Sequence, residues 1–197
     1  MMMDKDMFMF YKNALTNGLC EEYKNYWRGA NGNKSRLVEL AMIQQAIPFF
    51  ATYCYKGDGL SKEYLLEEYK DYINDTTLFD CDGVHGYSYK LYVDYKSDVM
   101  PLDVDVSHFM YCNGITINVA ETKCPTIYIS NKSNVTICCD GYNSLRVYLF
   151  DESKVVIDNC DEDTDVVIYK YSDNCNVEKG KFCLSEKVKE FDKELRL

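Results

Sequence analysis

The sequence predicts an α+β protein, with a small N-terminal helical domain followed by a short parallel β-solenoid of ten-residue half-coils and a C-terminal capping helix. Three observations predict this fold. Residues 1–78 carry apolar side chains at helical spacing, residues 114–182 repeat a strand and a turn every ten residues, and residues 183–197 return to helical spacing. Residues 79–113 alternate apolar and polar side chains and are expected to form entry strands.

The predicted helical domain is built from short amphipathic segments. In the stretch LCEEYKNYW, Leu19, Tyr23 and Tyr26 recur on one face of a helix. Ser61 marks the clearest helix start, because its side chain can cap the first turn while Leu65 continues the apolar stripe. Apolar stripes of this kind are typical of core packing, so we assign them to the interior.

The repeat appears as columns of apolar residues at intervals of ten. The central column is Ile117, Ile127, Ile137, Val147, Ile157, Val167 and Val177. A fixed short period of strand and turn is typical of a stacked solenoid, in which each unit buries its apolar face against its neighbours. An antiparallel meander could have the same period. The recurrence of like residues at like positions favours parallel stacking, where such residues lie directly above one another.

Ten residues provide only one strand and one corner, so one coil should need two units. Reading every twentieth residue then separates a polar outer face from one that is partly apolar and aromatic. The second face is expected to carry Tyr128, Tyr148, Val166 and Ile168, with Arg146 beside them. We predict that these five residues form an interface with a protein partner or a second copy, because tyrosine supplies large contact area at low entropic cost. Coverage of the face by the helical domain is the alternative.

The C-terminal segment LSEKVKEFDKELRL predicts the capping helix. Ser185 is placed as its N-cap, and Leu184, Val188, Phe191 and Leu195 follow helical spacing. Stacked β units leave open strand edges that promote aggregation. A helix at this position would cover the last coil.

Repeat units such as VYLFDESKVVI and IYISNKSNVTI resemble the V-x-Y-D-N-S-x-V repeats of uncharacterised β-solenoid proteins from gut bacteria and their bacteriophages. The segments LCEEYKNYW, LVELA and GLSKEYLLEEYKDYIN are similar to the helical part that precedes those repeats. The resemblance implies a solenoid fold and a phage or mobile-element context, and it implies no catalytic residues. A host-defence inhibitor and a virion or assembly component are the two functions expected in that context.

Composition restricts the classes of partner. The net charge of −10 is unfavourable for direct binding to nucleic acid, which needs clustered Lys and Arg. No apolar run approaches the length of a membrane span, and acidic residues near the start disagree with a signal peptide. We therefore expect a protein in the cytoplasm of the bacterial host cell that binds neither membranes nor nucleic acid.

Motifs for chemistry are weak. A zinc site is conceivable because two Cys and His pairs share a four-residue spacing: Cys81, His85, His108 and Cys112. Paired carboxylates for glycan cleavage are conceivable among Asp103, Asp105, Asp158 and Asp161. We expect a non-enzymatic protein without cofactor or metal. A ligand-binding sink or a glycan-active enzyme, using a groove beside the solenoid, is the alternative.

Overall fold

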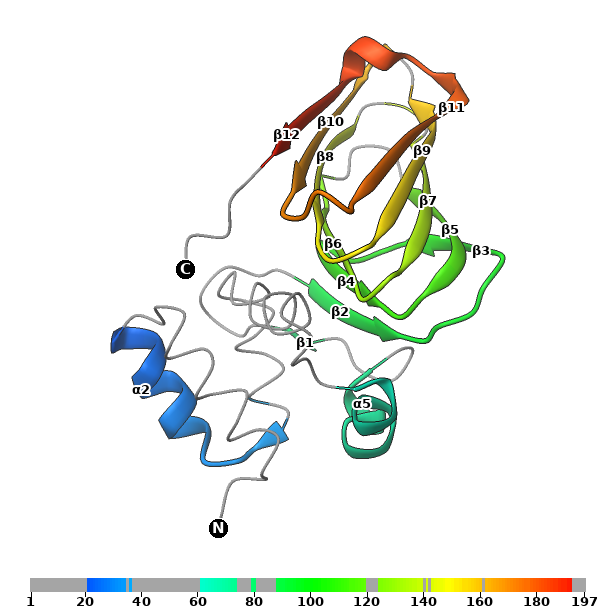
Figure 1. The fold of residues 1–197 in the computed structure, drawn as a ribbon. Helices are drawn as coiled ribbons and strands as arrows, with labels where there is room; N and C mark the ends of the chain where they lie inside the picture. Colours follow the sequence, from blue (N-terminus) through cyan, green and yellow to red (C-terminus); the bar gives the residue numbers. More distant parts are fainter. Residues whose placement is uncertain are drawn as a thin grey trace.

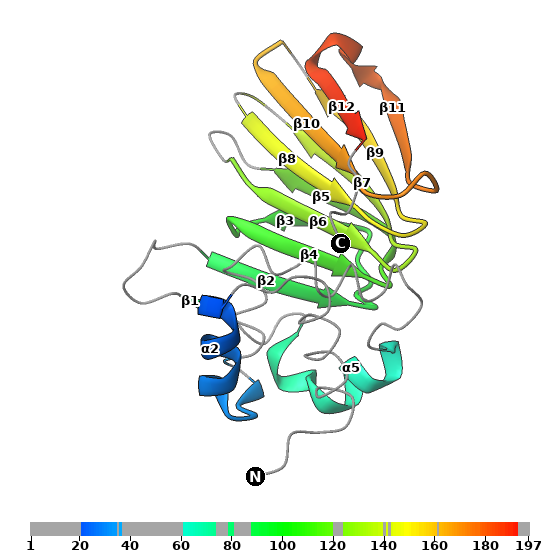
Figure 2. The same cartoon turned by 60° about the vertical axis from the view of Figure 1, so that its left-hand side comes forward.

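The protein was analysed as a computed structural model, which describes residues 21–34, 36, 61–73, 79–80, 88–119, 124–139, 141, 143–160 and 162–192. Within these residues the chain forms a parallel β-solenoid of about 5 turns (Figures 1 and 2). Each turn contributes one strand to each of two sheets, which face each other across the core.

The seven-stranded sheet contains the even-numbered strands together with β1. In spatial order its strands are β1 (Phe79–Asp80), β2 (Ser88–Val93), β4 (Val106–Met110), β6 (Thr126–Ser130), β8 (Asn143–Leu149), β10 (Thr164–Lys170) and β12 (Val188–Asp192). The five-stranded sheet has the order β11 (Asn176–Cys183), β9 (Lys154–Cys160), β7 (Asn134–Cys139), β5 (Asn113–Val119) and β3 (Val99–Leu102). The described strands pair in parallel, except for the antiparallel pair β1 and β2.

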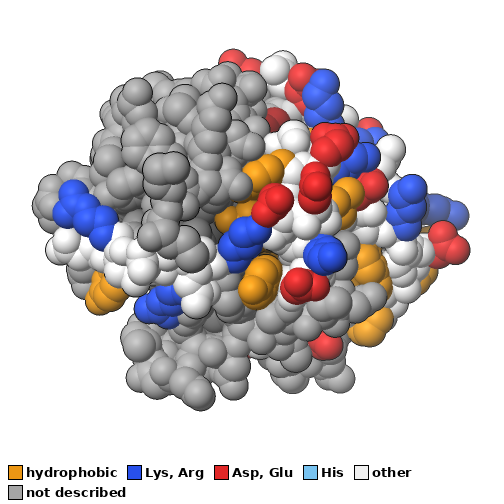
Figure 3. All heavy atoms as spheres, turned by 90° about the horizontal axis from the view of Figure 1, so that it is seen from below, with side chains coloured by type: hydrophobic (Ala, Val, Ile, Leu, Met, Phe, Trp, Pro, Cys, Tyr) orange, Lys and Arg blue, Asp and Glu red, His pale blue; other side chains and the backbone are white. Residues whose placement is uncertain are grey.

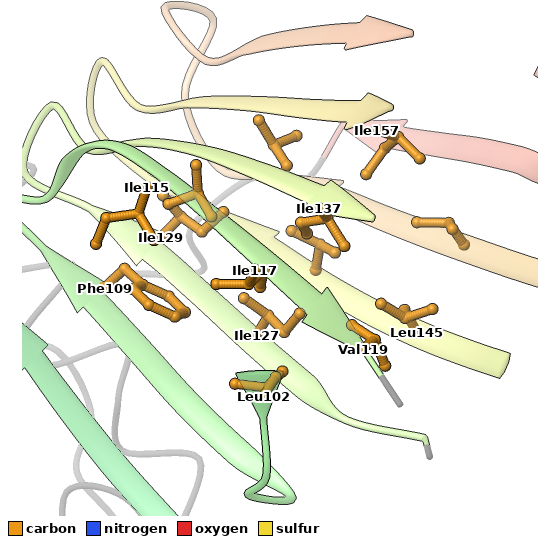
Figure 4. Packing of buried hydrophobic residues seen from close by; sticks show 14 of the residues in the cluster. Leu102, Phe109, Ile115, Ile117, Val119, Ile127, Ile129, Ile137, Leu145 and Ile157 are labelled. Carbon is orange, nitrogen blue, oxygen red and sulfur yellow. The ribbon is translucent and has the colours of Figure 1, made fainter. Parts of the chain in front are cut away.

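The register confirms the predicted parallel stacking. Ile137 on β7 pairs with Ile117 on β5 and with Ile157 on β9. These side chains form one row inside the solenoid, and side chains of the seven-stranded sheet, such as Ile127, lie opposite them (Figure 4). All four are fully buried, so each coil contributes apolar surface that only its neighbours cover.

One corner of the solenoid repeats the same backbone conformation in successive coils. Asp94, Tyr111, Asn131 and Asp151 each have a positive φ, between 48° and 61°. Asn and Asp tolerate this left-handed conformation better than most residues, which explains their place in the repeat. The conformation turns the chain sharply from the seven-stranded to the five-stranded sheet.

Two buried serines secure this corner from inside. The Ser133 hydroxyl donates to the carbonyl oxygen of Phe109 at 3.2 Å, and the Ser153 hydroxyl donates to that of Ile129 at 3.0 Å. Each acceptor belongs to the preceding coil, and each serine also contacts a carbonyl of its own turn. The serine of the repeat therefore links consecutive coils.

The described helices lie at the N-terminal end of the solenoid (Figures 1 and 2). They are α2 (Glu21–Ala30), α5 (Lys62–Glu68) and the 3-10 turn η1 (Lys70–Tyr72). The Ser61 side chain accepts a hydrogen bond from the Tyr64 backbone N–H at 3.1 Å, as the capping pattern predicts. Leu65 and Tyr69 are buried, and Lys62 reaches Asp94 after β2 at 3.4 Å. Most of the predicted helical domain, residues 1–78, lies outside the described residues.

Two features differ from the sequence-based expectation. Strands β2, β3 and β4, expected as entry strands, pair in parallel with later strands and belong to the stack. The predicted C-terminal capping helix is wrong over residues 188–192, which form β12 after the short 3-10 turn η3 (Ser185–Lys187). Val188 packs in the core and the β12 backbone pairs with β10, so tertiary pairing overrides the helical spacing of this segment.

Candidate functional site

The outer surface of the seven-stranded sheet carries a row of aromatic rings. The in-register positions of five consecutive strands, which we call the aromatic row, are His108, Tyr128, Tyr148, Tyr169 and Phe191. Because the residues are in register in parallel strands, their side chains point to the same side of the sheet.

Neighbouring rings of the aromatic row contact one another. Tyr128 and Tyr148 stack with centroids 4.7 Å apart and planes 14° apart, and Tyr148 stacks on Tyr169 at 5.0 Å. Phe191 continues the stack beyond Tyr169 at 5.7 Å, and His108 begins it with an edge contact to Tyr128 at 6.1 Å. The separations are close to the spacing of adjacent strands, so the sheet itself holds the rings in contact.

A second aromatic contact lies beside the row. Phe150 directly follows β8 and Tyr171 directly follows β10, and their rings stack with centroids 4.8 Å apart. Tyr171 also approaches Tyr148 at 6.4 Å. The outer face thus presents two adjoining columns of rings on one rigid sheet.

Exposure rises along the row from the N-terminal to the C-terminal coil. His108 is fully buried and Tyr128 is 6% exposed, whereas Tyr148 and Tyr169 are half-buried and Phe191 is 45% exposed. The N-terminal half of the row is therefore covered, and its C-terminal half is open to a partner. We call the open part, Tyr148, Tyr169, Tyr171 and Phe191, the aromatic face.

Burial and neighbouring cations set the charge of the aromatic face. Burial raises the pKa values of Tyr128, Tyr148 and Tyr171, and neighbouring tyrosines raise those of Tyr148 and Tyr171 further. These phenols therefore stay neutral hydrogen-bond donors. Arg146 lies on β8 two residues before Tyr148 and is exposed, which adds a cation next to the rings.

Three of the five predicted interface residues lie where the sequence placed them. Tyr128, Tyr148 and Arg146 are on the outer side of the sheet. Val166 and Ile168 are not: both are fully buried in the core, which corrects the prediction for these two residues.

The reason for this correction is one extra residue in the coil between Tyr148 and Tyr169. Tyr128 pairs with Tyr148, 20 positions on, but Tyr148 pairs with Tyr169, 21 positions on. A fixed period of ten slips by one residue here, and a slip of one residue exchanges the two faces of a strand. Sequence reasoning consequently missed Tyr169 and Tyr171, and it missed Phe191 because it assigned that residue to the capping helix. The recurrence of tyrosine at positions 148 and 169 was the signal for the longer coil.

A chain of hydrogen-bonded polar groups begins at His108, in the covered part of the row. The Nε2 atom of His108 lies 2.8 Å from Ser130 Oγ, whose hydroxyl donates to Asn131 Oδ1 at 2.6 Å. Asn131 N–H in turn donates to Asp151 Oδ2 at 2.8 Å. Burial lowers the pKa of His108 to about 3, so the ring is neutral. The Ser130 hydroxyl proton is donated to Asn131, so His108 Nε2 donates to Ser130 Oγ and does not act as a base toward this serine. Both side chains are fully buried.

The weak zinc candidates are not assembled by the described part of the chain. His108 points to the outer side of β4, whereas the Cys112 thiol lies in the core and contacts the carbonyl oxygens of Tyr92 and Met110 at 3.6 and 3.4 Å. Burial raises the pKa of Cys112 to about 12, which opposes the thiolate that zinc requires. Cys81 and His85 lie outside the described residues, and no group of three potential metal ligands occurs within them.

The carboxylates considered for glycan cleavage are also separated. Asp103 follows β3 and Asp158 lies on β9, three strand positions away in the same sheet, which is about 14 Å at ordinary strand spacing. Asp105 accepts hydrogen bonds from the backbone and hydroxyl of Ser88, at 2.9 and 2.8 Å. Asp161 lies outside the described residues. The described carboxylates on β3 and β9 are too far apart for a glycosidase pair.

Seen from the N-terminal end, acidic and basic side chains are interspersed over the described surface (Figure 3). No helix within the described ranges is both long and apolar enough to cross a membrane. Comparison of the chain with family models, curated proteins and solved structures finds no match in any of the three. The fold and the surface define the class of protein: a two-sheet parallel β-solenoid with an aromatic outer face.

Proposed function

We propose that the protein acts without catalysis, by binding another protein through the aromatic face of its solenoid. One observation carries the proposal: a stacked row of rings, fixed by strand register, emerges from a covered N-terminal half into an open C-terminal half. Rigid aromatic side chains lose little conformational entropy on binding, and Tyr and Arg are favoured where interfaces gain most energy.

The resemblance of the repeat units to phage and gut-bacterial solenoid repeats supports a mobile-element context. In that context the partner is a host defence factor, which the protein would inhibit in the bacterial cytoplasm, or a component of a virion. Self-association through the same face is the form that assembly would take. The acidic composition fits a protein partner better than nucleic acid or an anionic membrane surface.

A pair of charged substitutions tests the face. Tyr148→Arg combined with Phe191→Arg places two charges on the aromatic face and leaves Tyr169 between them, so that the new charges are not on adjacent strands. The matched control is Thr116→Arg with Val156→Arg, which has the same spacing on the outer side of the five-stranded sheet, with Thr136 between. All of these positions except the more exposed Phe191 are partly buried.

Sedimentation and chemical cross-linking in extracts of producing cells supply the readout, and circular dichroism verifies folding. We expect the wild type and the control to form the same complex, and the Tyr148→Arg with Phe191→Arg variant to lose it while staying folded. Equal behaviour of the two variants would contradict the proposal. A glycan or nucleotide that raises the melting temperature by several degrees would favour the ligand-binding alternative.

A further inference from the structure

The interior of the solenoid changes character in its last coil. On the five-stranded sheet the core positions Ile117, Ile137 and Ile157 are followed in register by Lys179. On the seven-stranded sheet the core positions Ile127, Val147 and Ile168 are followed by Glu190. In-register residues of parallel strands point to the same side, so Lys179 and Glu190 point inward.

These inward charges pair with each other across the two sheets. Lys179 Nζ lies 3.5 Å from Glu190 Oε1, which joins β11 to β12 over the end of the core. Lys170 Nζ adds contacts at 3.6 Å to Glu190 and at 3.1 Å to Asp192, which follows Lys170 in register. About one third of the Lys179 and Glu190 side chains is exposed, so the pair closes the core while keeping contact with water.

The last strands show further features that oppose strand addition. In the described sheets β11 and β12 are the terminal strands. Strand β11 departs from regular register between Lys179 and Phe182. Gly180 lies in this irregular part, so close to β9 that a Cβ on it would come within 2.6 Å of the Cα atom of Asp158. Irregular register, edge lysines and inward charges are known protections of open sheet edges.

Protection is needed here because the same end is otherwise attractive for stacking. Phe182 and Leu184 are exposed at 67% and 40%. Both sheets end in strands whose outer backbone groups have no further described strand to pair with. An apolar interior at such an end would be completed by the end of a second copy.

We propose that the inward pair Lys179 and Glu190 is a charged end cap that keeps a second copy of the chain from stacking on the C-terminal end of the solenoid. Stacking would remove both charges from water, and desolvation of an ion pair opposes association even when the pair stays intact. The cap replaces the terminal helix that the sequence predicts. The cap points into the core, whereas the aromatic face lies on the outer side of the seven-stranded sheet.

Restoring the apolar columns tests the cap. Lys179→Ile with Glu190→Val continues the two core columns into the last coil. The control, Lys189→Ile with Glu178→Val, removes the same two residue types from β12 and β11 at outward positions. Net charge is the same in both variants. Sedimentation equilibrium over a concentration series should show self-association at least about tenfold tighter for the inward variant than for the wild type or the control. Unchanged association of the inward variant, or equal association of the control, would overturn the proposal.

Charge reversal keeps the proposal testable if the inward variant does not fold. Glu190→Lys alone places three lysines together at the end of the core, and should lower the melting temperature by several degrees without causing association. Adding Lys179→Glu restores an inward pair of opposite charges and should recover most of the loss. If Glu190→Lys leaves the melting temperature unchanged, or if Lys179→Glu gives no recovery, the two charges do not form a cap. These variants leave Tyr148, Tyr169 and Tyr171 intact. Partner binding therefore tests the proposed function, whereas self-association and melting temperature test the cap.

Discussion

Tyr128 and Tyr148 stack with their ring planes 14° apart because β6 and β8 place them in register on the outer side of one sheet. The contact needs no special loop or bound group, since the backbone ladder alone sets the separation of 4.7 Å. The two rings also mark a boundary, because Tyr128 is covered and Tyr148 is half open. The same strand pairing that builds the core thus builds the candidate interaction surface.

Ile137→Asp should destabilise the protein severely. Ile137 is fully buried between Ile117 and Ile157, so the substitution leaves an unpaired charge among aliphatic side chains. We expect a loss of more than about 4 kcal/mol in the free energy of unfolding, or failure to fold. Thr136→Asp, its outward-facing neighbour, should cost less than about 1 kcal/mol. Urea unfolding of both variants measures the difference, and equal losses would show that the faces are assigned wrongly.

Ser153→Ala should lower stability through the corner of the solenoid. The Ser153 hydroxyl bonds to the carbonyl oxygens of Ile129 and Phe150 and accepts from the Phe150 N–H at 3.2 Å. Removing it leaves buried backbone groups with fewer partners, at an expected cost of about 1–3 kcal/mol. Ser144→Ala, at an exposed position of β8, is the control and should change stability little. The measurement is the midpoint of chemical unfolding, and an unchanged midpoint for Ser153→Ala would contradict the linking role.

We expect the stability of the protein to depend on pH through Asp151. Burial raises the pKa of Asp151 from 3.8 to about 6, so between these values the folded state holds more protons than the unfolded state. The free energy of unfolding therefore falls as pH rises through that window. The cost of burying the ionised Asp151 carboxylate is complete above about pH 6.

Asp151→Asn removes this penalty. The amide keeps an oxygen for the Asn131 N–H and suits the positive φ of 61°. At about pH 8 the variant should be more stable by roughly 1–2 kcal/mol, after allowance for solvent screening, and below about pH 4 it should equal the wild type. Thermal melts across the pH range measure this difference. A pH-independent effect would show that charge is not the cause.

Cysteine reactivity should follow burial. Cys124 is exposed, whereas burial raises the pKa of Cys112 to about 12 and that of Cys175 to about 11. Since the thiolate is the reactive form, a maleimide should label Cys124 before Cys175 and Cys112. Peptide mass spectrometry gives the order. Metal analysis of the same preparation completes the test: one equivalent of zinc that disappears in Cys112→Ser would contradict the expectation of a metal-free protein.

The parallel core was predictable because its signal is simple. Stacked columns such as Ile117, Ile137 and Ile157 leave the same residue type at a constant interval, and parallel pairing requires that interval. The aromatic face was predictable only in part. One extra residue between Tyr148 and Tyr169 exchanges inside and outside on β10, and a count by tens does not detect it.

The C-terminal segment could not be assigned from its own sequence. Leu184, Val188 and Phe191 fit the spacing of a helix, whereas a strand over residues 188–192 mixes apolar and charged side chains on both of its sides. The choice depends on the exposed edge of β10, which offers hydrogen bonds to a strand. The role of Glu190 in turn becomes visible only when Lys179 on β11 is placed opposite it.

Photo-crosslinking from position 169 tests most directly whether the aromatic face contacts another protein. Tyr169 is replaced by p-benzoylphenylalanine, a bulky aromatic that preserves stacking, and the control carries the same group at Thr136 on the outer side of the five-stranded sheet. After irradiation of producing cells, we expect one discrete crosslinked species from position 169, either a partner or a second copy, and none from position 136. Equal products from the two positions, or none from position 169, would contradict the assignment of the aromatic face as the interaction surface.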